Sequence, residues 1–428
     1  MKLEEKANKY ITIFLLSQPI IDLITSIGLR FFDIDLSFGM ITRFLFIMFG
    51  IVYVLFFSKS LDKKKSLIYI FIILIYGIIY MFNAFYLRGI NVVYGESKAL
   101  IKLFYFPVLL TVFWNVFDSN QFKSKTLIKV SYIYIIIILI AQFTGTAFVS
   151  YSGGKMGHVG WFFSPNEIGA IIAIMSPFII WNLINNRKKF INYIYLFIYI
   201  YSTFIIGTKV PFVGMALSIF GIVIVYFIKV IFEKKQRKKN LFILILPLVI
   251  SLFIFIFMIP NTPAGYNLKI HLNWLKIENI EDLYKPNNKE ELTNFVFSSR
   301  DKFLKETKDY YNTSSFSEKL LGIGYINKDG ENMKSIERDY HEIFYRNGIV
   351  GFLLYFLLFF NIIIKIIKEG FSKIKKIIND IEIVSYILSL CLVISIAFFA
   401  GHVFVAPSVS IYITILILNL NYKLKKLE

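Results

Sequence analysis

The sequence has only one cysteine, Cys391, and that residue lies inside an apolar run. One thiol excludes an intramolecular disulfide and argues against a cysteine-based metal site. The chain also lacks the G-x-x-x-x-G-K-[S/T] pattern of a phosphate-binding loop, and it shows no evident internal repeat or low-complexity stretch. These absences exclude a disulfide-stabilised scaffold and a P-loop nucleotide hydrolase.

Apolar side chains are abundant instead, at 57% of the 428 residues. An ordinary soluble domain carries about 45 to 50%, and a helix that spans a bilayer uses about 20 mostly apolar residues. The excess excludes a soluble enzyme. It predicts an all-α polytopic integral membrane protein.

Twelve apolar runs are long enough to be transmembrane helices. They cover residues 10–29, 36–58, 66–86, 99–117, 130–149, 168–184, 191–207, 212–230, 241–260, 347–367, 381–400 and 408–420. The first run has no small-residue cleavage site and contains Asp22, so it reads as a true span and not as a removed signal peptide. The predicted organisation is a membrane domain of nine helices over 1–260, a large loop over 261–346, and three further helices over 347–428.

Charge predicts the orientation of these helices. With both termini on one side, that side collects 27 of the 47 Lys and Arg residues, while each short loop on the other side carries two at most. The positive-inside rule therefore puts both termini in the cytoplasm and the loop 261–346 outside. This loop holds 13 basic and 14 acidic residues, as expected of a folded, solvent-exposed subdomain. The net charge of +19 thus reflects topology and does not indicate a nucleic-acid partner.

No predicted cytoplasmic segment is longer than about 18 residues, so none could form a nucleotide-binding domain. Any work must be driven by the substrate itself or by an ion gradient. Because the only substantial mass outside the membrane is external, the outer face of the cytoplasmic membrane is the expected active surface.

Two ionisable residues lie inside predicted spans, where charge is costly and marks a functional site or a buried pair. Asp22 and Arg43 each lie seven residues from the outer end of their span, about 10 Å below the interface. They could form an ion pair. The pair either sets the register of two helices or takes part in substrate binding.

Further cations gather near the outer interface. They are Arg88, Lys98, Lys102, Lys155, Lys209 and Arg300, together with His158. Such a set suits a diphosphate, because Arg offers a planar fork and Lys a point charge to oxygen anions. Lys98 and Lys102 could instead simply extend to the interface. Lys209 lies in a turn too short to form a solvated loop, so it is held near the membrane surface.

Two other segments could bind or activate a substrate. The glycine-rich stretch 151–169 opens a helix at Pro165-Asn166-Glu167, and a helix N-terminus favours anions, although Glu167 could be an ordinary first-turn residue. The end of the large loop places His341 and Glu342 one to two helical turns above the membrane, where either could take a proton from a hydroxyl nucleophile. The alternative is a surface helix of alternating charge. His402 is external, and the sequence identifies no partner for it.

Taken together, these features resemble the O-antigen ligase and O-antigen polymerase superfamily, especially its Gram-positive polysaccharide polymerase and teichuronic acid members. The resemblance covers nearly the whole chain and rests on loose motifs in the family's order. They are Gln18–Leu23, the signature at 160–167, Gly207-Thr208-Lys209, Ser299-Arg300, Gly322-Ile323-Gly324 and the run 339–351.

The resemblance implies a GT-C-type membrane glycosyltransferase that needs no nucleotide sugar, metal or other cofactor. Its donor would be an oligosaccharide on undecaprenyl diphosphate. Its acceptor would be a hydroxyl of another lipid-linked glycan, in a polymerase, or of a wall or lipid anchor, in a ligase. Other polysaccharide export proteins are possible partners.

The resemblance also implies residue roles. Lys209 and Arg300 would bind the diphosphate, and we group Arg43, Arg88, Lys102, Lys155 and Asn166 with them as candidate substrate-binding residues. His341 would be the base, with Glu342, Asp339 and Glu337 as competitors. Two departures are evident: Lys209 replaces a more usual Arg, and Glu342 follows His341 where ligases commonly have Asn.

A twelve-helix secondary transporter or lipid-glycan flippase is the main alternative, and a receptor or assembly scaffold is a third possibility. Transporters tend to show repeated halves and charges at the membrane midplane. The sequence shows neither feature, and a large external loop would have no evident task in a transporter.

Overall fold

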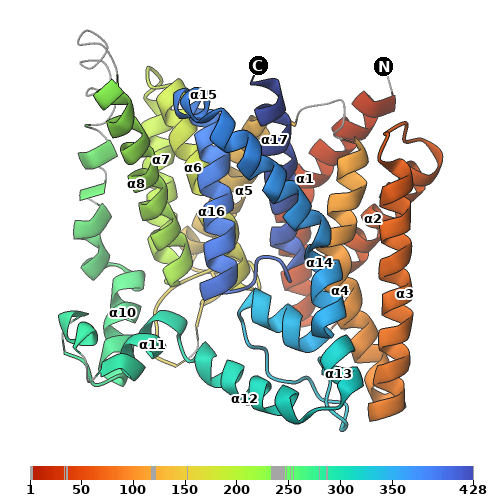
Figure 1. The fold of residues 1–428 in the computed structure, drawn as a ribbon. Coiled ribbons are helices and arrows are strands. Elements are labelled where there is room, and N and C mark those ends of the chain that lie inside the picture. Colours follow the sequence, from red (N-terminus) through yellow and green to blue (C-terminus); the bar gives the residue numbers. More distant parts are fainter. Residues whose placement is uncertain are drawn as a thin grey trace.

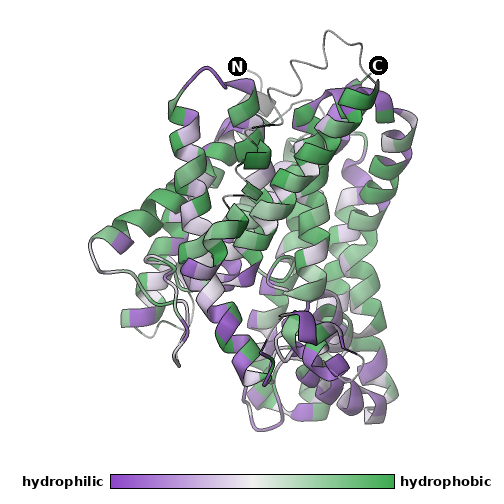
Figure 2. Cartoon of the chain, turned by 90° about the vertical axis from the view of Figure 1, so that its left-hand side faces the viewer, coloured by the Kyte–Doolittle hydropathy of each residue, from purple (hydrophilic) through white to green (hydrophobic). Residues whose placement is uncertain are grey.

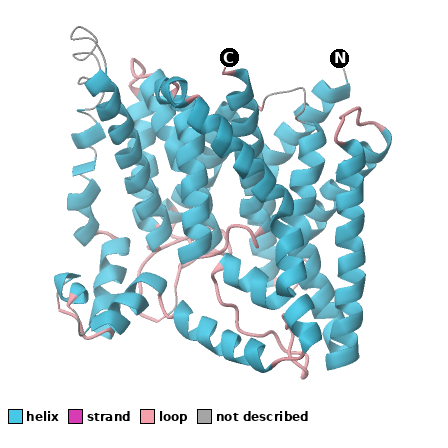
Figure 3. Ribbon diagram, viewed as in Figure 1, coloured by secondary structure: helices cyan, strands magenta, loops and turns pink. Residues whose placement is uncertain are grey.

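The computed structural model describes residues 3–32, 34, 37–116, 122–151, 153–232, 246, 248–250, 252–253, 255–278, 280–285 and 288–427. Over these residues the chain forms helices and loops and contains no strand (Figure 3). Two isolated β-bridges, Val149 with His158 and Ile326 with Asn332, close short loops. The all-α expectation is therefore confirmed for the described part of the chain.

The helices follow the apolar runs of the sequence. Their bounds are α1 Leu3–Phe31, α2 Phe38–Phe56, α3 Lys63–Arg88, η1 Ile90–Val92, α4 Val93–Val116, α5 Ser124–Phe143, α6 Pro165–Asn185, α7 Ile191–Ile205, α8 Lys209–Phe232, η2 Ile259–Asn261, α10 Pro263–Trp274, η3 Ile280–Tyr284, α11 Lys289–Phe297, α12 Arg300–Thr313, α13 Phe316–Leu321, α14 Asp339–Ser372, α15 Ile374–Asn379, α16 Ile381–Phe399 and α17 Pro407–Lys426.

Nine helices among the described residues are long and apolar enough to cross a membrane, or ten if one bent pair of helices is counted as a span. They match nine of the twelve predicted runs. The run 191–207 forms the shorter helix α7, the run 408–420 forms α17 with its lysine-rich last turn, and the run 241–260 lies partly outside the described residues. The protein is a multi-pass membrane protein, and the count of twelve spans stays a prediction.

The core of the bundle lies around α6, α16 and α17. α6 packs against α8 and α16, and most of its residues are buried. By contrast, α2 and α3 expose large apolar side chains such as Phe49, Phe56 and Phe82, and Figure 2 shows that apolar residues make up much of the helical segments. Such a surface is expected where a helix faces lipid, because hydrocarbon gives apolar side chains no reason to turn inward.

The large loop lies at one end of the bundle. Figure 1 shows α10 to α13 there, while the start of α1 and the end of α17 lie at the opposite end. We call the end of the bundle that carries α10 to α13 the loop end. Leu272, Ile277 and Leu283 form a small apolar cluster of their own, whereas Ile326 and Ile343 join the main core of the bundle. The loop is therefore anchored to the membrane helices by its last third and, through Ala264, by its start.

Candidate functional site

A cavity of about 710 Å³ lies at the loop end, lined by residues from the start of α8, from α10, from the start of α12 and from the end of α16. We call it the first cavity. Its charged lining residues in the described part of the chain are Lys155, Lys209, Arg300 and Glu337, and Asn166 at the start of α6 also lines it. Four of the seven predicted substrate-binding residues, Lys155, Asn166, Lys209 and Arg300, therefore line one cavity. The carboxylate of Glu337 lines it as well.

Lys209 is positioned by a close approach of two backbone segments. It is the first residue of α8, directly after Gly207 and Thr208. Gly207 has a φ of 75°, and a Cβ there would lie 2.4 Å from the carbonyl oxygen of Met156. The Asn267 side chain holds both segments, because its Nδ2 donates to the carbonyl oxygens of Met156 and Gly207 at 2.5 and 2.9 Å. Only glycine fits this contact.

The ammonium of Lys209 is held by neutral groups. Its Nζ donates to the carbonyl oxygen of Phe295 at 2.5 Å, lies 3.1 Å from Nδ1 of His271, and lies 4.3 Å from the centre of the Phe295 ring. No carboxylate of the described residues forms an ion pair with it. A half-buried ammonium without a counter-ion favours an anionic ligand.

Arg300 is the first residue of α12, and only 13% of its side chain is exposed. Its Nη2 lies 2.9 Å from Oε2 of Glu337, and its Nη1 donates to the carbonyl oxygen of Phe297 at 3.3 Å. Its Nε is buried and has no hydrogen-bond partner among the described residues. An unpaired buried donor is costly, so this guanidinium has capacity left for a ligand.

Left-handed backbone gathers at the same place. Five non-glycine residues of the described chain have such a conformation, and four of them are Ser298, Ser299, Glu337 and His402, with φ between 54° and 68°. Ser298 and Glu337 line the first cavity, Ser299 precedes Arg300, and His402 faces Glu337. Each such residue costs about 1 kcal/mol or more, and strain of this kind concentrates at functional sites.

Glu337 and His402 form a pair that the sequence did not reveal. Oε2 of Glu337 lies 3.8 Å from Nε2 of His402. The His402 ring and, after it, the Arg300 guanidinium lower the pKa of Glu337 to about 2, against the opposing effect of burial. Burial alone would lower the pKa of His402, but the neighbouring carboxylates, Glu337 first, outweigh it and raise that pKa. Glu337 is therefore an ionised carboxylate between the Arg300 guanidinium and the His402 ring.

Asp339 explains why His402 lies there. Its carboxylate accepts hydrogen bonds from the backbone N–H groups of His402, Val403 and Phe404 at 2.8, 2.9 and 2.6 Å. These bonds hold the loop after α16 against the start of α14. Asp339 thus anchors this loop. Among the described residues, each hydrogen bond that its carboxylate accepts comes from a backbone N–H group.

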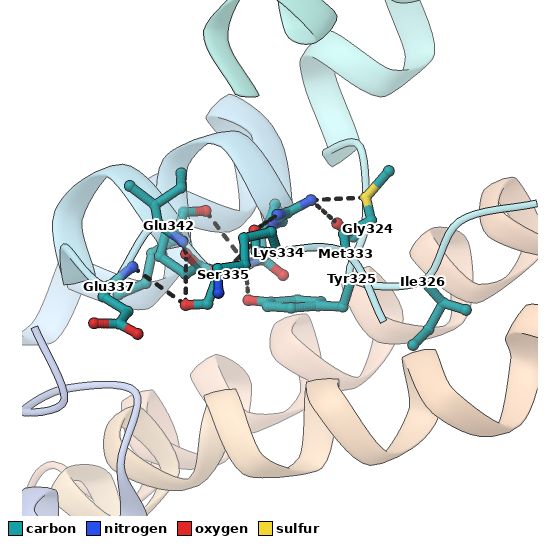
Figure 4. A network of polar contacts seen from close by, with 12 residues as sticks. Gly324, Tyr325, Ile326, Met333, Lys334, Ser335, Glu337 and Glu342 are labelled. Carbon is teal, nitrogen blue, oxygen red and sulfur yellow. Dashed lines mark hydrogen bonds and ion pairs between the residues drawn. The ribbon is translucent and has the colours of Figure 1, made fainter. Parts of the chain in front are cut away.

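Glu342 is likewise engaged. It accepts hydrogen bonds from the N–H of Ile336 at 2.5 Å and from Oγ of Ser335 at 3.2 Å, and it lies 3.4 Å from Nε of Arg346 (Figure 4). Arg346 in turn donates to the carbonyl oxygens of Gly324 and Lys334. This network shapes the loop 324–336 above the membrane helices.

His341 lies against Phe398, with the ring centres 6.3 Å apart, and its Nδ1 is buried without a partner among the described residues. It does not belong to the described lining of the first cavity. Of the predicted bases, the structure therefore brings none of His341, Asp339 and Glu342 next to the cations of that cavity. Glu337 is the carboxylate that lies there.

Lys155 lies over the rings of Tyr151 and Trp274, at 5.0 and 4.7 Å from their centres. Burial and the charge of Arg300 lower the pKa of Lys155. The like charge of Arg300 thus adds to the effect of burial on Lys155, and a bound anion would relieve that repulsion.

The remaining predicted cations lie elsewhere. Arg43 pairs with Asp22, as expected, and its Nε donates to Oε1 of Gln18 at 2.9 Å. Arg88 is buried and donates to Glu96 at 2.8 Å and to the carbonyl oxygen of Ile326 at 2.6 Å. Lys102 lines two smaller cavities near α4. These three residues are not gathered with Lys209 and Arg300.

We predict that Arg88 stabilises the folded protein through its ion pair with Glu96. Glu96 is fully buried and also accepts hydrogen bonds from Tyr80, Tyr325 and Ile326. Removing one partner of a buried ion pair costs about 3 to 5 kcal/mol, so Arg88→Met should lower the thermal unfolding midpoint of the purified protein markedly. The double variant Arg88→Met/Glu96→Gln should recover part of the loss. An unchanged midpoint with lost activity would instead assign Arg88 to the substrate.

Comparison with known proteins identifies the family of the chain. Residues 4–291 and 278–427 match a family described as O-antigen ligase like membrane protein. A search of curated proteins finds no match. The family is glycosyltransferase-like and points to membrane glycan ligation or polymerisation, which favours an enzyme over a transporter. Because the two matched stretches together cover nearly the whole chain, the protein belongs to the O-antigen ligase-like membrane protein family.

Proposed function

We propose that this protein is a glycosyltransferase that polymerises or ligates a cell-surface polysaccharide. The donor is a glycan on undecaprenyl diphosphate and the acceptor is a hydroxyl group. The observation that carries the proposal is the convergence of Lys155, Lys209 and Arg300 on one cavity beside the carboxylate of Glu337. A diphosphate supplies the negative charge that these cations lack.

The reaction is a displacement at the anomeric carbon. The acceptor oxygen forms a bond to that carbon while the bond from the carbon to the phosphate oxygen breaks, and the electron pair leaves with the lipid diphosphate. Lys209 and Arg300 neutralise the charge that builds on the leaving group, which is the largest catalytic contribution expected of such a site. The activated donor supplies the free energy, so the step consumes no nucleotide.

We assign the base to Glu337. In the empty site its pKa is held at about 2, which makes it a weak base. Bound diphosphate would compete for Arg300 and withdraw one of the two groups that stabilise the carboxylate. The pKa of Glu337 then rises, and the carboxylate accepts the proton of the acceptor hydroxyl only when donor is present.

Replacement of His341 tests whether Glu337 or His341 is the base. Since its ring packs on Phe398 and outside the first cavity, His341→Ala should retain transfer within roughly threefold of the unaltered protein. A positioned base contributes about 10²- to 10⁴-fold, so a loss of that size would return the role to His341. Initial rates with saturating donor and acceptor make the comparison.

The proposal includes the orientation. With both termini in the cytoplasm, the loop end faces the outside of the cytoplasmic membrane, in agreement with the positive-inside rule. Lipid-linked glycan would then be reached from the outer leaflet. A GT-C-type arrangement with about twelve spans belongs to the same proposal.

The direct experiment mixes purified protein in detergent or nanodiscs with an undecaprenyl-diphosphate oligosaccharide and no nucleotide. A ladder of products on a gel indicates a polymerase, and transfer to a different acceptor indicates a ligase. If neither product nor donor hydrolysis is detected while the same protein moves the lipid across a vesicle bilayer, the transporter alternative replaces this proposal.

A further inference from the structure

A second cavity of about 600 Å³ lies beside the first, between the start of α4, the loop 325–342 and the segment 402–405. Among the described lining residues, Glu337 is the one that both cavities share. If the first cavity holds the donor, a group that enters the second cavity meets the proposed base from the opposite side. The second cavity therefore has the position that an acceptor requires.

The carboxylates of the second cavity are already engaged. Asp339 accepts three backbone hydrogen bonds, and Glu342 is bound by Ser335, Ile336 and Arg346. Glu337 pairs with Arg300 in the neighbouring cavity. Each of these three carboxylates is bound by donors that belong to the protein.

Lys102 has no such partner. It lies on α4, is exposed, and forms no ion pair or hydrogen bond with the described residues. It lies one turn further into the bundle than Lys98, which lines the same cavity. The inner part of the second cavity thus offers an ammonium group whose charge the described protein leaves unbalanced.

The outer part of the cavity has a different character. Its lining includes the amides of Asn91 and Asn332 and the ring of Tyr94, all exposed. Amides and an aromatic face can hydrogen-bond and stack with a sugar, and they carry no charge. From outside to inside, the wall changes from neutral polar groups to a cation.

We propose that the second cavity is the acceptor site and that its acceptor is an anionic glycan, with a negatively charged group held by Lys102. This inference rests on the proposed glycosyl transfer. The shared chemistry is an anionic oxygen, which the acceptor can carry as a sugar carboxylate or as the phosphate of its own lipid carrier. The transfer step stays as written above, with the acceptor proton passing to Glu337.

The experiment measures acceptor KM, donor KM and donor hydrolysis without acceptor, for the full-length protein and for Lys102→Met. Lys102→Met removes one charge-assisted contact to the acceptor, so we expect it to raise acceptor KM by about tenfold or more. Donor KM and donor hydrolysis should stay within about twofold. Lys155→Met should show the opposite pattern, and Lys328→Met, an exposed loop cation, should change none of the three.

Three acceptors distinguish the sources of the anion: a neutral free oligosaccharide, the same oligosaccharide with a uronic acid, and the neutral oligosaccharide on a lipid diphosphate. The unaltered protein should prefer at least one charged form over the neutral one by about tenfold, and Lys102→Met should lose that preference. Lys102→Arg, which keeps the charge, should retain it and shows that the site tolerates substitution.

An active protein whose acceptor KM is unchanged in Lys102→Met, or whose donor KM rises instead, overturns the acceptor assignment alone. An unaltered protein that neither transfers nor hydrolyses the donor overturns the proposed function, and this inference falls with it.

Discussion

Arg300→Ala and Lys209→Ala should each abolish polymer formation in cells while leaving the protein in the membrane. Arg300 aims a buried, partly unpaired guanidinium at the first cavity, and Lys209 brings an ammonium with no carboxylate partner among the described residues. Loss of one preorganised donor to a developing negative charge costs about 10²- to 10³-fold in rate. In vitro, initial transfer rates should fall by at least about 10²-fold.

The matched control for these variants is Lys308→Ala, which removes an exposed cation of the same helix as Arg300 and should leave the rate unchanged. Arg300→Lys should be intermediate, because it keeps the charge and loses the planar fork. Membrane abundance and the unfolding midpoint separate lost chemistry from lost folding. Normal polymer from either alanine variant would refute the diphosphate assignment.

Glu337→Gln should lower kcat by about 10²- to 10⁴-fold, the range expected for a positioned base. Its donor KM should not rise, because the substitution removes the carboxylate that competes with diphosphate for Arg300. This split distinguishes Glu337 from the cations, whose loss should weaken donor binding as well. Steady-state kinetics with each substrate varied in turn give both constants.

Glu337→Asp keeps the charge on a shorter side chain and should recover part of the rate. If the role of Glu337 were only structural, Gln would replace it as well as Asp does. His402→Gln should have a smaller effect than Glu337→Gln, because His402 acts on the base and not on the acceptor. A Glu337→Gln protein with full kcat would end the assignment and direct attention back to His341.

The membrane helices could be predicted because each is encoded by one continuous run of residues. Segments such as 381–400 and 347–367 are apolar over the full thickness of a bilayer; α16 covers all but the last residue of the first, and α14 contains the second. Turn length singles out Lys209 and the family resemblance singles out both Lys209 and Arg300, and the two residues line one cavity. The shapes of the cavities were beyond prediction, because they depend on how α10, the start of α12 and the loop 325–342 pack against the membrane helices.

Apart from the pair of Asp22 and Arg43, the sequence did not indicate the charge partners. Arg88, a predicted substrate-binding residue, is buried in an ion pair with Glu96, a residue to which the sequence assigns no role. Lys209 was recognised, but its neighbour His271 was not, because α10 enters the site from a distant part of the chain. A buried charge is neutralised by whichever group packing brings close, and packing is not a local property.

The sequence by itself determined that the chain is a helical membrane protein with a hydrophilic loop between apolar runs, because backbone in lipid must satisfy its own hydrogen bonds and apolar length sets where it can do so. It also predicted the sidedness through the placement of Lys and Arg. Only the tertiary structure decided which charges remain available for a ligand. Asp339 ties residues 402–404 to the start of α14, and through that tie His402 meets Glu337 beside Arg300. Such a meeting depends on long-range contacts, whose geometry no run of neighbouring residues contains.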